Sequence, residues 1–332
     1  MPDSAFSKSR QPVLDLSNLR VSFGNGPATV DGVDIVIGPG EIVCLVGVSG
    51  SGKSLTGLAL MRLTPPEAIV VADRWLFEGE DLTDATAADM ARLRGHRMAM
   101  VFQDPLQALN PLMTIGDQIV EVIQAHQPMS PTAARGAALA LLDDVSLAGG
   151  AERFTLYPHQ MSGGMRQRAL IAMALAGRPR LLIADEPTSA LDAVVQREII
   201  TLIDRLRRDH ELAALLITHN LAHVEEIADS VSVMRAGTIV ERGSREDIFS
   251  DPQHPYTLEL LAAAFGIPAI SAQAGIMRKP PAFSGRATNG CGFVAHCPLA
   301  ADICANRRPI LSRLTGSHEV ACWRAPIAKP NA

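Results

Sequence analysis

The residues best suited to chemistry form a glycine-rich segment, GVSGSGKS, at residues 47–54. It follows a short apolar run, Ile42–Val46, precedes a helical pattern, and fits G-x-x-x-x-G-K-[ST]. Glycines in such a turn let backbone N–H groups curl around a phosphate, and the helix N-terminus adds its positive dipole end. The segment therefore predicts a site for the phosphates of a nucleotide.

Individual residues of this segment have predicted roles. Lys53 is expected to reach the β- and γ-phosphates, and Ser54 is expected to ligate Mg²⁺. The other loop residues expected at the nucleotide are Ser49, Gly50, Ser51 and Gly52. The alternative is a glycine–serine linker that contains a lysine, and the strand and helix patterns on either side argue against it.

A second segment, LLIADE at residues 181–186, ends an apolar run in two carboxylates. Ligands of open α/β sheets bind at the carboxyl ends of strands, where these side chains are expected. Asp185 suits contact with Mg²⁺, directly or through water, and Glu186 suits a general base that polarises an attacking water. Alone, the segment could be a solvated acidic turn before Pro187. Together with the first segment it indicates a catalytic centre.

The elements that must position these segments follow an α/β pattern. Continuous apolar runs are typical of strands buried on both faces, as in parallel sheets. The predicted strands span residues 42–46, 181–184, 214–217, 231–234 and 238–240, the last two joined through 235–237. The sequence therefore predicts a mostly parallel sheet covered by helices.

Helices are expected at residues 53–63, stopped by Pro65 and Pro66, and at 193–208. The second helix has these apolar residues on one side: Val194, Val195, Ile199, Leu202, Ile203 and Leu206. The Ala-rich interval 114–147 is expected to be mainly helical and inserted between the motifs. From about residue 268, Pro, Gly, Arg and Cys become frequent and the periodicity fades, which indicates a boundary.

Composition argues against several classes of protein. Only 4% of the residues are aromatic, and the formal net charge is −5 without an obvious basic stripe, so we expect no nucleic-acid partner. The N-terminus lacks the apolar core of a secretory signal, and no run of about 18 apolar residues predicts a membrane helix. A protein docked on the inner face of a membrane remains compatible with these features.

Residues 161–168, MSGGMRQR, resemble the signature sequence of ABC ATPases, and further marks of that family stand in order. Gln103 resembles the Q-loop glutamine, Asp192 in SALD the D-loop, and His219 in LLITHN the switch histidine. Phe23 stands where the family places an aromatic ring against adenine. The resemblance covers roughly residues 13–261 and implies a P-loop ATPase that binds ATP and Mg²⁺.

The same resemblance implies further roles. Gln103 would contact ATP and Mg²⁺, His219 would join Glu186 in catalysis, and Ser162, Gly163 and Gly164 would bind ATP held by a second subunit. Each has a simpler alternative: a helix N-cap turn for the signature, a strand-end histidine for His219, core packing for Phe23. Met161 replaces a more usual leucine, and Phe23 a more usual tyrosine. Every chemical residue is present, so we expect a competent site.

Two further stretches, residues 102–118 and 253–263, resemble the ATP-binding subunits of dipeptide and oligopeptide importers, as do GCGFVAHCPLAADIC at 290–304 and HEVACW at 318–323. This resemblance implies a different, homologous ATPase as partner, two membrane-spanning permease subunits met near Gln103 to Met113, and an extracytoplasmic solute-binding protein. It places the chain on the cytoplasmic face of the membrane. The alternatives are import of nickel or another small solute, and a non-transport ABC ATPase.

The implied domains are an ATPase domain at residues 13–265, with a helical subdomain at about 105–178, and a C-terminal extension at 266–332. The extension carries cysteines spaced C-x5-C-x6-C-x17-C: Cys291, Cys297, Cys304 and Cys322. In a reducing compartment this favours metal binding over disulfides, as either Zn²⁺ or an iron–sulfur cluster.

The importer resemblance implies a [4Fe–4S] cluster on these four thiols. His296 or His318 could replace one thiolate in the coordination shell. Free thiols are the structural alternative. Cys44, within the first apolar strand, is expected to be a small buried hydrophobic residue.

Overall fold

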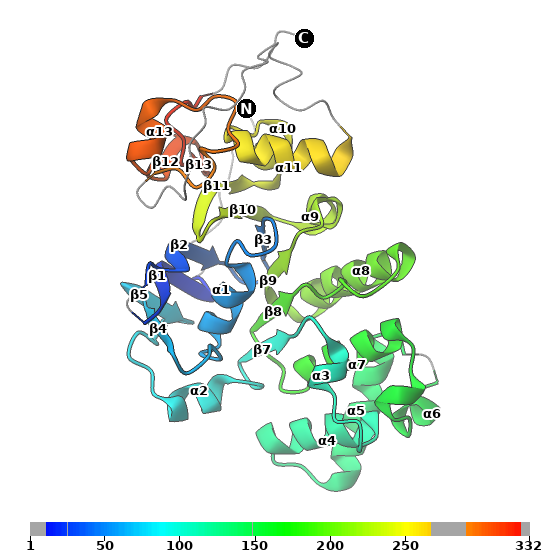
Figure 1. Ribbon diagram of the computed structural model, residues 1–332. Helices are drawn as coiled ribbons and strands as arrows, with labels where there is room; N and C mark the ends of the chain where they lie inside the picture. The colour runs from blue at the N-terminus through cyan, green and yellow to red at the C-terminus, as the bar shows by residue number, and fades with distance from the viewer. Residues whose placement is uncertain (1–10, 25, 148, 267–289, 327–332) are drawn as a thin grey trace, which may run out of the picture.

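A computed structural model describes residues 11–24, 26–147, 149–266 and 290–326 of the 332-residue chain. Figure 1 shows the sheets in the middle, the helices α3 to α7 gathered at one end, and the C-terminal residues beside α10 and α11 at the other. The arrangement is the α/β fold that the sequence predicts.

The larger sheet has eight strands in the order β12-β13-β11-β10-β3-β9-β8-β7. Its strands are β3 (Ile42–Val46), β7 (Met98–Val101), β8 (Leu181–Asp185), β9 (Ala213–Thr218), β10 (Ser230–Arg235), β11 (Thr238–Ser244), β12 (Ser312–Thr315) and β13 (His318–Val320). The run from β10 to β7 is parallel throughout. Every residue of β3, β8 and β9 is buried, as strands covered on both faces require.

A second sheet is antiparallel, and the sequence did not predict it. It contains β1 (Leu14–Phe23), β2 (Val30–Ile37), β4 (Ala68–Val71), β5 (Arg74–Phe77) and β6 (Glu80–Asp81). Its inward side chains share a core with Val43 and Leu45 of β3 and with Ala59 and Leu60 of α1 (Lys53–Leu60). This sheet and α1 therefore cover one face of the parallel strands.

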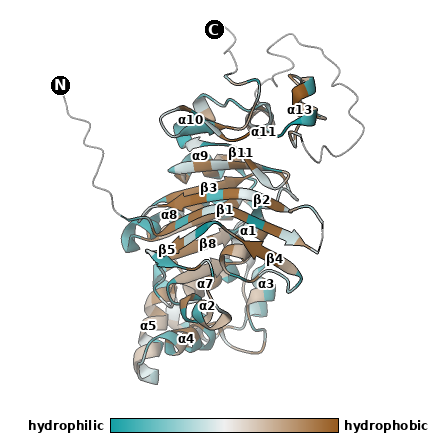
Figure 2. Cartoon of the chain, turned by 90° about the vertical axis from the view of Figure 1, so that its left-hand side faces the viewer, coloured by the Kyte–Doolittle hydropathy of each residue, from teal (hydrophilic) through white to brown (hydrophobic). Residues whose placement is uncertain are grey.

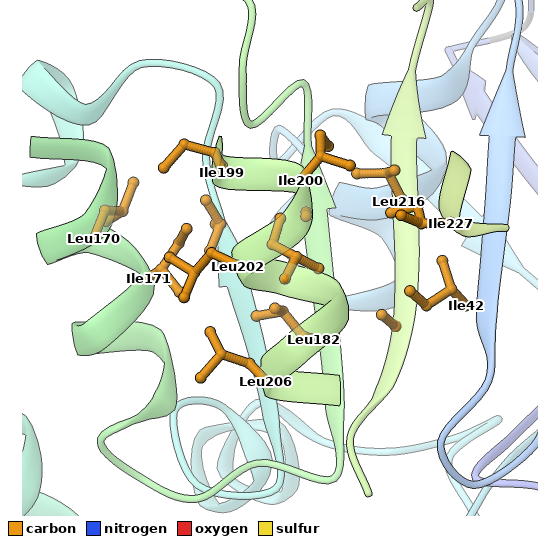
Figure 3. Close-up of a cluster of buried hydrophobic side chains, with 14 of the residues drawn as sticks. Ile42, Leu170, Ile171, Leu182, Ile199, Ile200, Leu202, Leu206, Leu216 and Ile227 are labelled. Atoms are coloured by element: carbon orange, nitrogen blue, oxygen red, sulfur yellow. The ribbon is translucent and has the colours of Figure 1, made fainter. Parts of the chain in front are cut away.

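Helices cover the opposite face of the parallel strands. They are α8 (Ala193–His210), α9 (Leu221–Ile227), α10 (Arg245–Ser250) and α11 (Pro255–Phe265). Side chains of α7, α8 and the sheet meet in one cluster that includes Ile171, Leu182 and Leu202 (Figure 3). Val194 was predicted on the buried side of this helix, but it lies in the first turn of α8 and is 71% exposed.

The inserted region is helical, as predicted. It comprises α3 (Pro105–Ala108), α4 (Ile115–His126), α5 (Pro131–Asp144), α6 (Gly150–Phe154), a 3₁₀ turn (Pro158–Gln160) and α7 (Gly163–Leu175). The preceding helix, α2 (Ala87–Leu93), instead packs in the core of the antiparallel sheet through Met90 and Leu93. Ile115, Ile119 and Ile123 follow the helical period along α4 and are buried. The first helix of the chain, α1, ends at Leu60, earlier than the predicted 63, because Arg62 adopts a left-handed conformation.

The described C-terminal residues extend the larger sheet at one edge. They form α13 (Asp302–Asn306) and the hairpin β12–β13, and β13 pairs antiparallel with β11. The division at residue 265/266 stays a prediction, and residues 267–289 lie outside the described part of the chain.

Hydropathy follows this architecture. Figure 2 shows the strands of both sheets as the most hydrophobic part of the chain, whereas the outer helices carry many hydrophilic residues. Within the ranges that the structure describes, no helix combines the length and apolar character needed to cross a membrane.

Candidate functional site

The segment 47–54 forms a loop between β3 and α1, as predicted. Gly47, Gly50 and Gly52 have φ angles of 155°, 78° and 108°, which favour glycine. A Cβ atom on Gly47 would lie 2.3 Å from the carbonyl oxygen of Met234. The loop is thus packed against the end of β10, and glycine at this position is required by the close approach of two backbones.

The start of α1 offers backbone donors. Its N-cap is Gly52, and no side chain caps the first turn. Four N–H groups at a helix start lack partners within the helix, and an anion can accept from them. The geometry of the loop therefore fits a phosphate group.

Lys53 is buried beneath this loop, with 6% of its surface exposed. Its Nζ donates to the carbonyl oxygens of Gly47, at 2.8 Å, and Val48, at 3.2 Å. Burial lowers the pKa of Lys53, and the charges of Glu186 and Asp185 oppose this change. The ammonium group is thus held at the loop, next to two carboxylates.

The two predicted Mg²⁺ ligands lie together. Ser54 Oγ donates to Asp185 Oδ1 over 2.9 Å, joining the first turn of α1 to the end of β8. Burial raises the pKa of Asp185, the charge of Glu186 acts in the same direction, and Ser54 and Lys53 oppose it. A hydroxyl and a carboxylate at one point form an oxygen donor set of the kind that Mg²⁺ prefers.

Glu186 and His219 form the other close pair. His219 Nδ1 lies 2.8 Å from Glu186 Oε2, across the ends of the neighbouring strands β8 and β9. Glu186 has a left-handed φ of 46°, and its N–H donates to the carbonyl oxygen of Ile217. The carboxylate is 11% exposed and the imidazole 59% exposed. An ordered carboxylate at a sheet edge, reachable by water, suits a general base.

The signature residues start α7. Ser162 is the N-cap, and its Oγ accepts from the N–H of Met165 at 3.3 Å. A Cβ atom on Gly164 would lie 2.6 Å from Val195 Cγ1, so the signature packs against the start of α8. Asp192 caps α8 by accepting from the N–H groups of Val194 and Val195. Both segments thus have helix-capping roles within this chain.

Phe23 and Gln103 are the other two residues predicted at the nucleotide. Phe23 ends β1 with 37% of its surface exposed, and Gln103 is exposed between β7 and α3. Neither residue makes a described hydrogen bond to residues 47–54. The described contacts join Lys53, Ser54, Asp185, Glu186 and His219, and the placement of Phe23 and Gln103 at the nucleotide stays a prediction.

Sequence reasoning missed one residue at the loop. The hydroxyl oxygen of Tyr256, in the first turn of α11, accepts from the N–H of Val48 over 3.0 Å. The two residues are 208 positions apart, so no local pattern could have paired them.

The four C-terminal cysteines are free thiols in one neighbourhood. Burial, together with smaller effects of the charges of Cys322, Cys291 and Cys304, raises the pKa of Cys297 to about 12, and the N–H of Leu299 opposes this change. The N–H groups of Phe293 and Arg324 donate to the sulfurs of Cys291 and Cys322. In the described part of the chain, however, no three His, Cys, Asp or Glu side chains are arranged to hold a metal ion.

The histidines considered as substitute ligands have other partners. His318 Nε2 lies 2.8 Å from Glu241 Oε1 in a buried pair, and His296 is exposed and stacks on Phe293. Cys44 is fully buried, as predicted, and burial raises its pKa.

Comparison with known proteins supports the geometry. Residues 30–189 match the ABC transporter family, and residues 240–304 match the family described as the oligopeptide/dipeptide transporter C-terminal region. Solved structures with the same fold include cbiO1 of Clostridium perfringens, 21% identical with a TM-score of 0.64 over 77% of this chain and 97% of that one. A dimeric cassette, MJ0796, bound to ADP and Pi is 26% identical with a TM-score of 0.59 over 70% and 98%.

Curated relatives match over nearly the whole chain. The dipeptide transport ATP-binding protein DppD of Bacillus subtilis is 42% identical over 94% of this chain and 95% of its own length. A putative peptide import ATP-binding protein of Brucella melitensis is 42% identical over 95% and 98%. The relatives are 42% identical over nearly the whole chain, and both family models match. The chain therefore belongs to the ATP-hydrolysing subunits of ABC transporters, in the group that carries the oligopeptide/dipeptide transporter C-terminal region.

Proposed function

We propose that this chain hydrolyses ATP to drive uptake of dipeptides or oligopeptides across the cytoplasmic membrane. One observation carries the proposal: an intact set of nucleotide-site residues lies in a chain whose C-terminal region and curated relatives are of the peptide-transporter type. The fold of the ATPase domain is by itself compatible with the transport of many different solutes, so the peptide assignment depends on the match of the C-terminal region.

The site residues have distinct proposed roles. The N–H groups of residues 49–54 and the ammonium of Lys53 bind the β- and γ-phosphates. Ser54, Asp185 and Gln103 would hold Mg²⁺, which when bound would neutralise developing charge on the phosphates. Phe23 supports the adenine ring.

Hydrolysis requires a base for the attacking water. Glu186 accepts a proton as water attacks the γ-phosphorus and the bond to the β–γ bridging oxygen breaks, which releases ADP and phosphate. His219, hydrogen-bonded to Glu186, lies where it can orient that carboxylate. A carboxylate fixed by its neighbours loses less entropy on reaching the reactive geometry.

A second ATPase subunit completes the site. Ser162, Gly163 and Gly164 lie at the start of α7, and we propose that they bind the γ-phosphate of ATP held by a homologous partner, while Asp192 lies at the same junction. Closure of the two subunits around ATP then supplies the motion that transport needs.

The membrane partners are proposed to dock on residues 102–113. Phe102, Leu106 and Leu112 in this segment are 38%, 56% and 85% exposed, although such side chains are commonly buried. Two permease subunits with a matching apolar surface would hold the chain on the cytoplasmic face of the membrane, and an extracytoplasmic binding protein would deliver the solute.

We also propose that Cys291, Cys297, Cys304 and Cys322 hold a [4Fe–4S] cluster, with Zn²⁺ as the alternative. The thiols lie close enough together for the charges of three of them to affect the pKa of Cys297, and backbone N–H groups donate to two of the sulfurs. Both observations support this donor set. Such a cluster would supply a cross-link between distant parts of the C-terminal region.

The cluster is tested by anaerobic purification followed by iron, sulfide and zinc analysis. We expect iron and sulfide in the wild type and in a Cys44→Ala control, and loss of both in Cys297→Ser. A colourless wild-type protein with stoichiometric zinc would replace the cluster by a zinc site.

Peptide import is tested in cells whose only copy of the protein carries Glu186→Gln. We expect uptake of labelled di- and oligopeptides to stop while the variant remains at the membrane. Glu225→Gln, which alters an exposed glutamate of α9, is the matched control and should transport normally. Normal uptake by Glu186→Gln, in a strain without a redundant system, would reject the peptide assignment and direct the search to nickel and other small solutes.

A further inference from the structure

The segment 253–263, QHPYTLELLAA, has no part in the chemistry described above, yet it begins at one of the most buried polar groups of the protein. The Glu241 carboxylate, at the centre of this group, is fully buried. It accepts from the N–H groups of Gln253 and His254, at 2.5 and 3.0 Å, and lies 2.8 Å from His318 Nε2. One carboxylate therefore fixes the start of α11 to β11 and to β13.

The next contact sets the direction of α11. His254 is its N-cap, and the Nδ1 atom accepts from the N–H of Tyr256 over 3.0 Å. With the cap fixed by Glu241 and the first turn fixed by His254, the phenol of Tyr256 has a defined position. Its oxygen accepts the N–H of Val48, at the beginning of the phosphate loop.

The ring of Tyr256 is in contact with Phe293 and with Arg235. The Phe293 ring lies 5.4 Å away between centroids, and the guanidinium carbon of Arg235 stands 4.8 Å above the ring. Only 3% of Tyr256 and 2% of Phe293 is exposed. Aromatic rings at this centroid distance attract each other, and Phe293 comes from the cysteine-bearing C-terminal region.

A second set of contacts connects the C-terminal region with the phosphate loop. A Cβ atom on Gly292 would lie 2.9 Å from the Cβ of Ala236, so the C-terminal region packs against the turn between β10 and β11. In that turn the N–H of Gly237 donates to the carbonyl oxygen of Ser51 over 2.9 Å. Two hydrogen bonds, to Val48 and to Ser51, therefore hold the phosphate loop, and residues 292–293 pack behind the groups that make them.

We propose that Tyr256 is a positioning residue for the phosphate loop, and that the C-terminal region acts on ATP affinity through Phe293 and Tyr256. Val48 N–H, fixed by the phenol, keeps the loop open in the shape that receives a phosphate, while its carbonyl oxygen accepts from Lys53. This inference rests on the proposed nucleotide site and adds to it a control by the C-terminal region.

The test compares Tyr256→Phe, which keeps the ring and removes the hydroxyl, with the wild type in the assembled transporter. We expect KM for ATP to rise about two- to tenfold, the change that one lost hydrogen bond produces, with kcat and the melting temperature nearly unchanged. Tyr157→Phe, at the chain's other tyrosine, is the matched control and should leave KM as it is. Unchanged KM in Tyr256→Phe would show that the ring acts only in packing and overturn the proposal.

Phe293→Leu tests the link to the C-terminal region. We expect KM to rise in the same direction, and Tyr256→Phe combined with Phe293→Leu to show no further increase, because both act through one hydroxyl. Phe265→Leu, a more exposed aromatic of α11, is the control. Additive effects, or none from Phe293→Leu, would remove the C-terminal region from the proposal.

Failure of the nucleotide site itself is distinguishable from failure of this inference. Titration of ATP into the full chain should give saturable binding that Lys53→Ala abolishes. If Lys53→Ala binds ATP as the wild type does, the site is wrong. If Lys53→Ala loses ATP binding while Tyr256→Phe keeps the full affinity for ATP, only the positioning role of Tyr256 is wrong.

Discussion

Glu186 and His219 face each other at the ends of adjacent parallel strands, with Nδ1 2.8 Å from Oε2. The contact joins a residue in a left-handed backbone conformation to one that begins the loop after β9. A glutamate in this conformation is uncommon, and the hydrogen bond from its N–H to Ile217 helps to hold it there. The pair therefore owes its geometry to the sheet.

Replacing the base tests the role of this pair. Glu186→Gln keeps the side-chain shape and a contact with His219 but cannot accept the proton of water. We expect kcat for ATP hydrolysis to fall by about 10²- to 10⁴-fold, the range of general-base catalysis, with ATP affinity retained. Phosphate release and equilibrium binding of ATP measure the two effects separately.

The exposed Glu225→Gln is again the control and should keep the wild-type rate. Hydrolysis by Glu186→Gln at more than about a tenth of that rate would assign the base to another residue.

Ser54 provides a test of the Mg²⁺ site. Ser54→Ala removes the hydroxyl that donates to Asp185 and leaves the phosphate loop in place. We expect the Mg²⁺ concentration for half-maximal hydrolysis to rise by at least about tenfold, because an oxygen donor to the ion is lost. A Mg²⁺ titration at saturating ATP measures this shift.

Ser250→Ala, in the exposed last turn of α10, serves as the control for Ser54→Ala. An unchanged Mg²⁺ requirement in Ser54→Ala would place the ion elsewhere.

The sequence predicted the parts of the site that depend on local pattern. Residues 47–54 and 181–186 carry their chemistry within a strand and the turn after it, so one apolar run and a few polar residues identify them. Packing then brings Ser54 to Asp185 and Glu186 to His219, as the parallel order of the strands requires.

Other features depend on contacts between distant segments. The antiparallel sheet was missed because β1 mixes polar and apolar residues and gains its register from β2, β4 and β5. Tyr256 was missed because its hydroxyl acts on Val48 only after α11 is anchored at Glu241. Neither relation leaves a periodic signal in the sequence.

Two glycines with different surroundings test the packing of the helical region. Gly136 lies within α5, is exposed, and has open space where a Cβ would stand, so Gly136→Ala should raise the free energy of unfolding by about 0.5–1 kcal/mol. A Cβ atom on Gly177 would collide with backbone atoms of Gly95, so Gly177→Ala should lower the free energy of unfolding by about 1–3 kcal/mol.

Urea denaturation of both variants measures these changes against the wild type. Equal effects of the two substitutions would contradict the described approach of the backbone at residues 95 and 177.

The buried pair of His318 and Glu241 predicts how stability depends on pH. The hydrogen bond with Glu241 raises the pKa of His318 above its usual 6.5, burial opposes this, and the charges of Glu241, Asp247 and Asp251 raise it further. A raised pKa in the folded state means that the protonated form stabilises the fold. This stabilisation is complete below pH 6.5 and is lost as the pH rises through the folded-state pKa.

His318→Gln keeps a donor for Glu241 but removes the charge. We expect it to lower the free energy of unfolding by about 3–5 kcal/mol at acidic pH, because a buried carboxylate loses its charged partner, and by less as the pH rises. Urea denaturation from about pH 6 to about pH 9 measures the difference from the wild type. His159→Gln, at an exposed histidine that stacks on Tyr157, should show no such trend. A difference that is constant with pH, or that grows as the pH rises, would mean that His318 is neutral in the folded protein and that Glu241 is held by the N–H groups of Gln253 and His254.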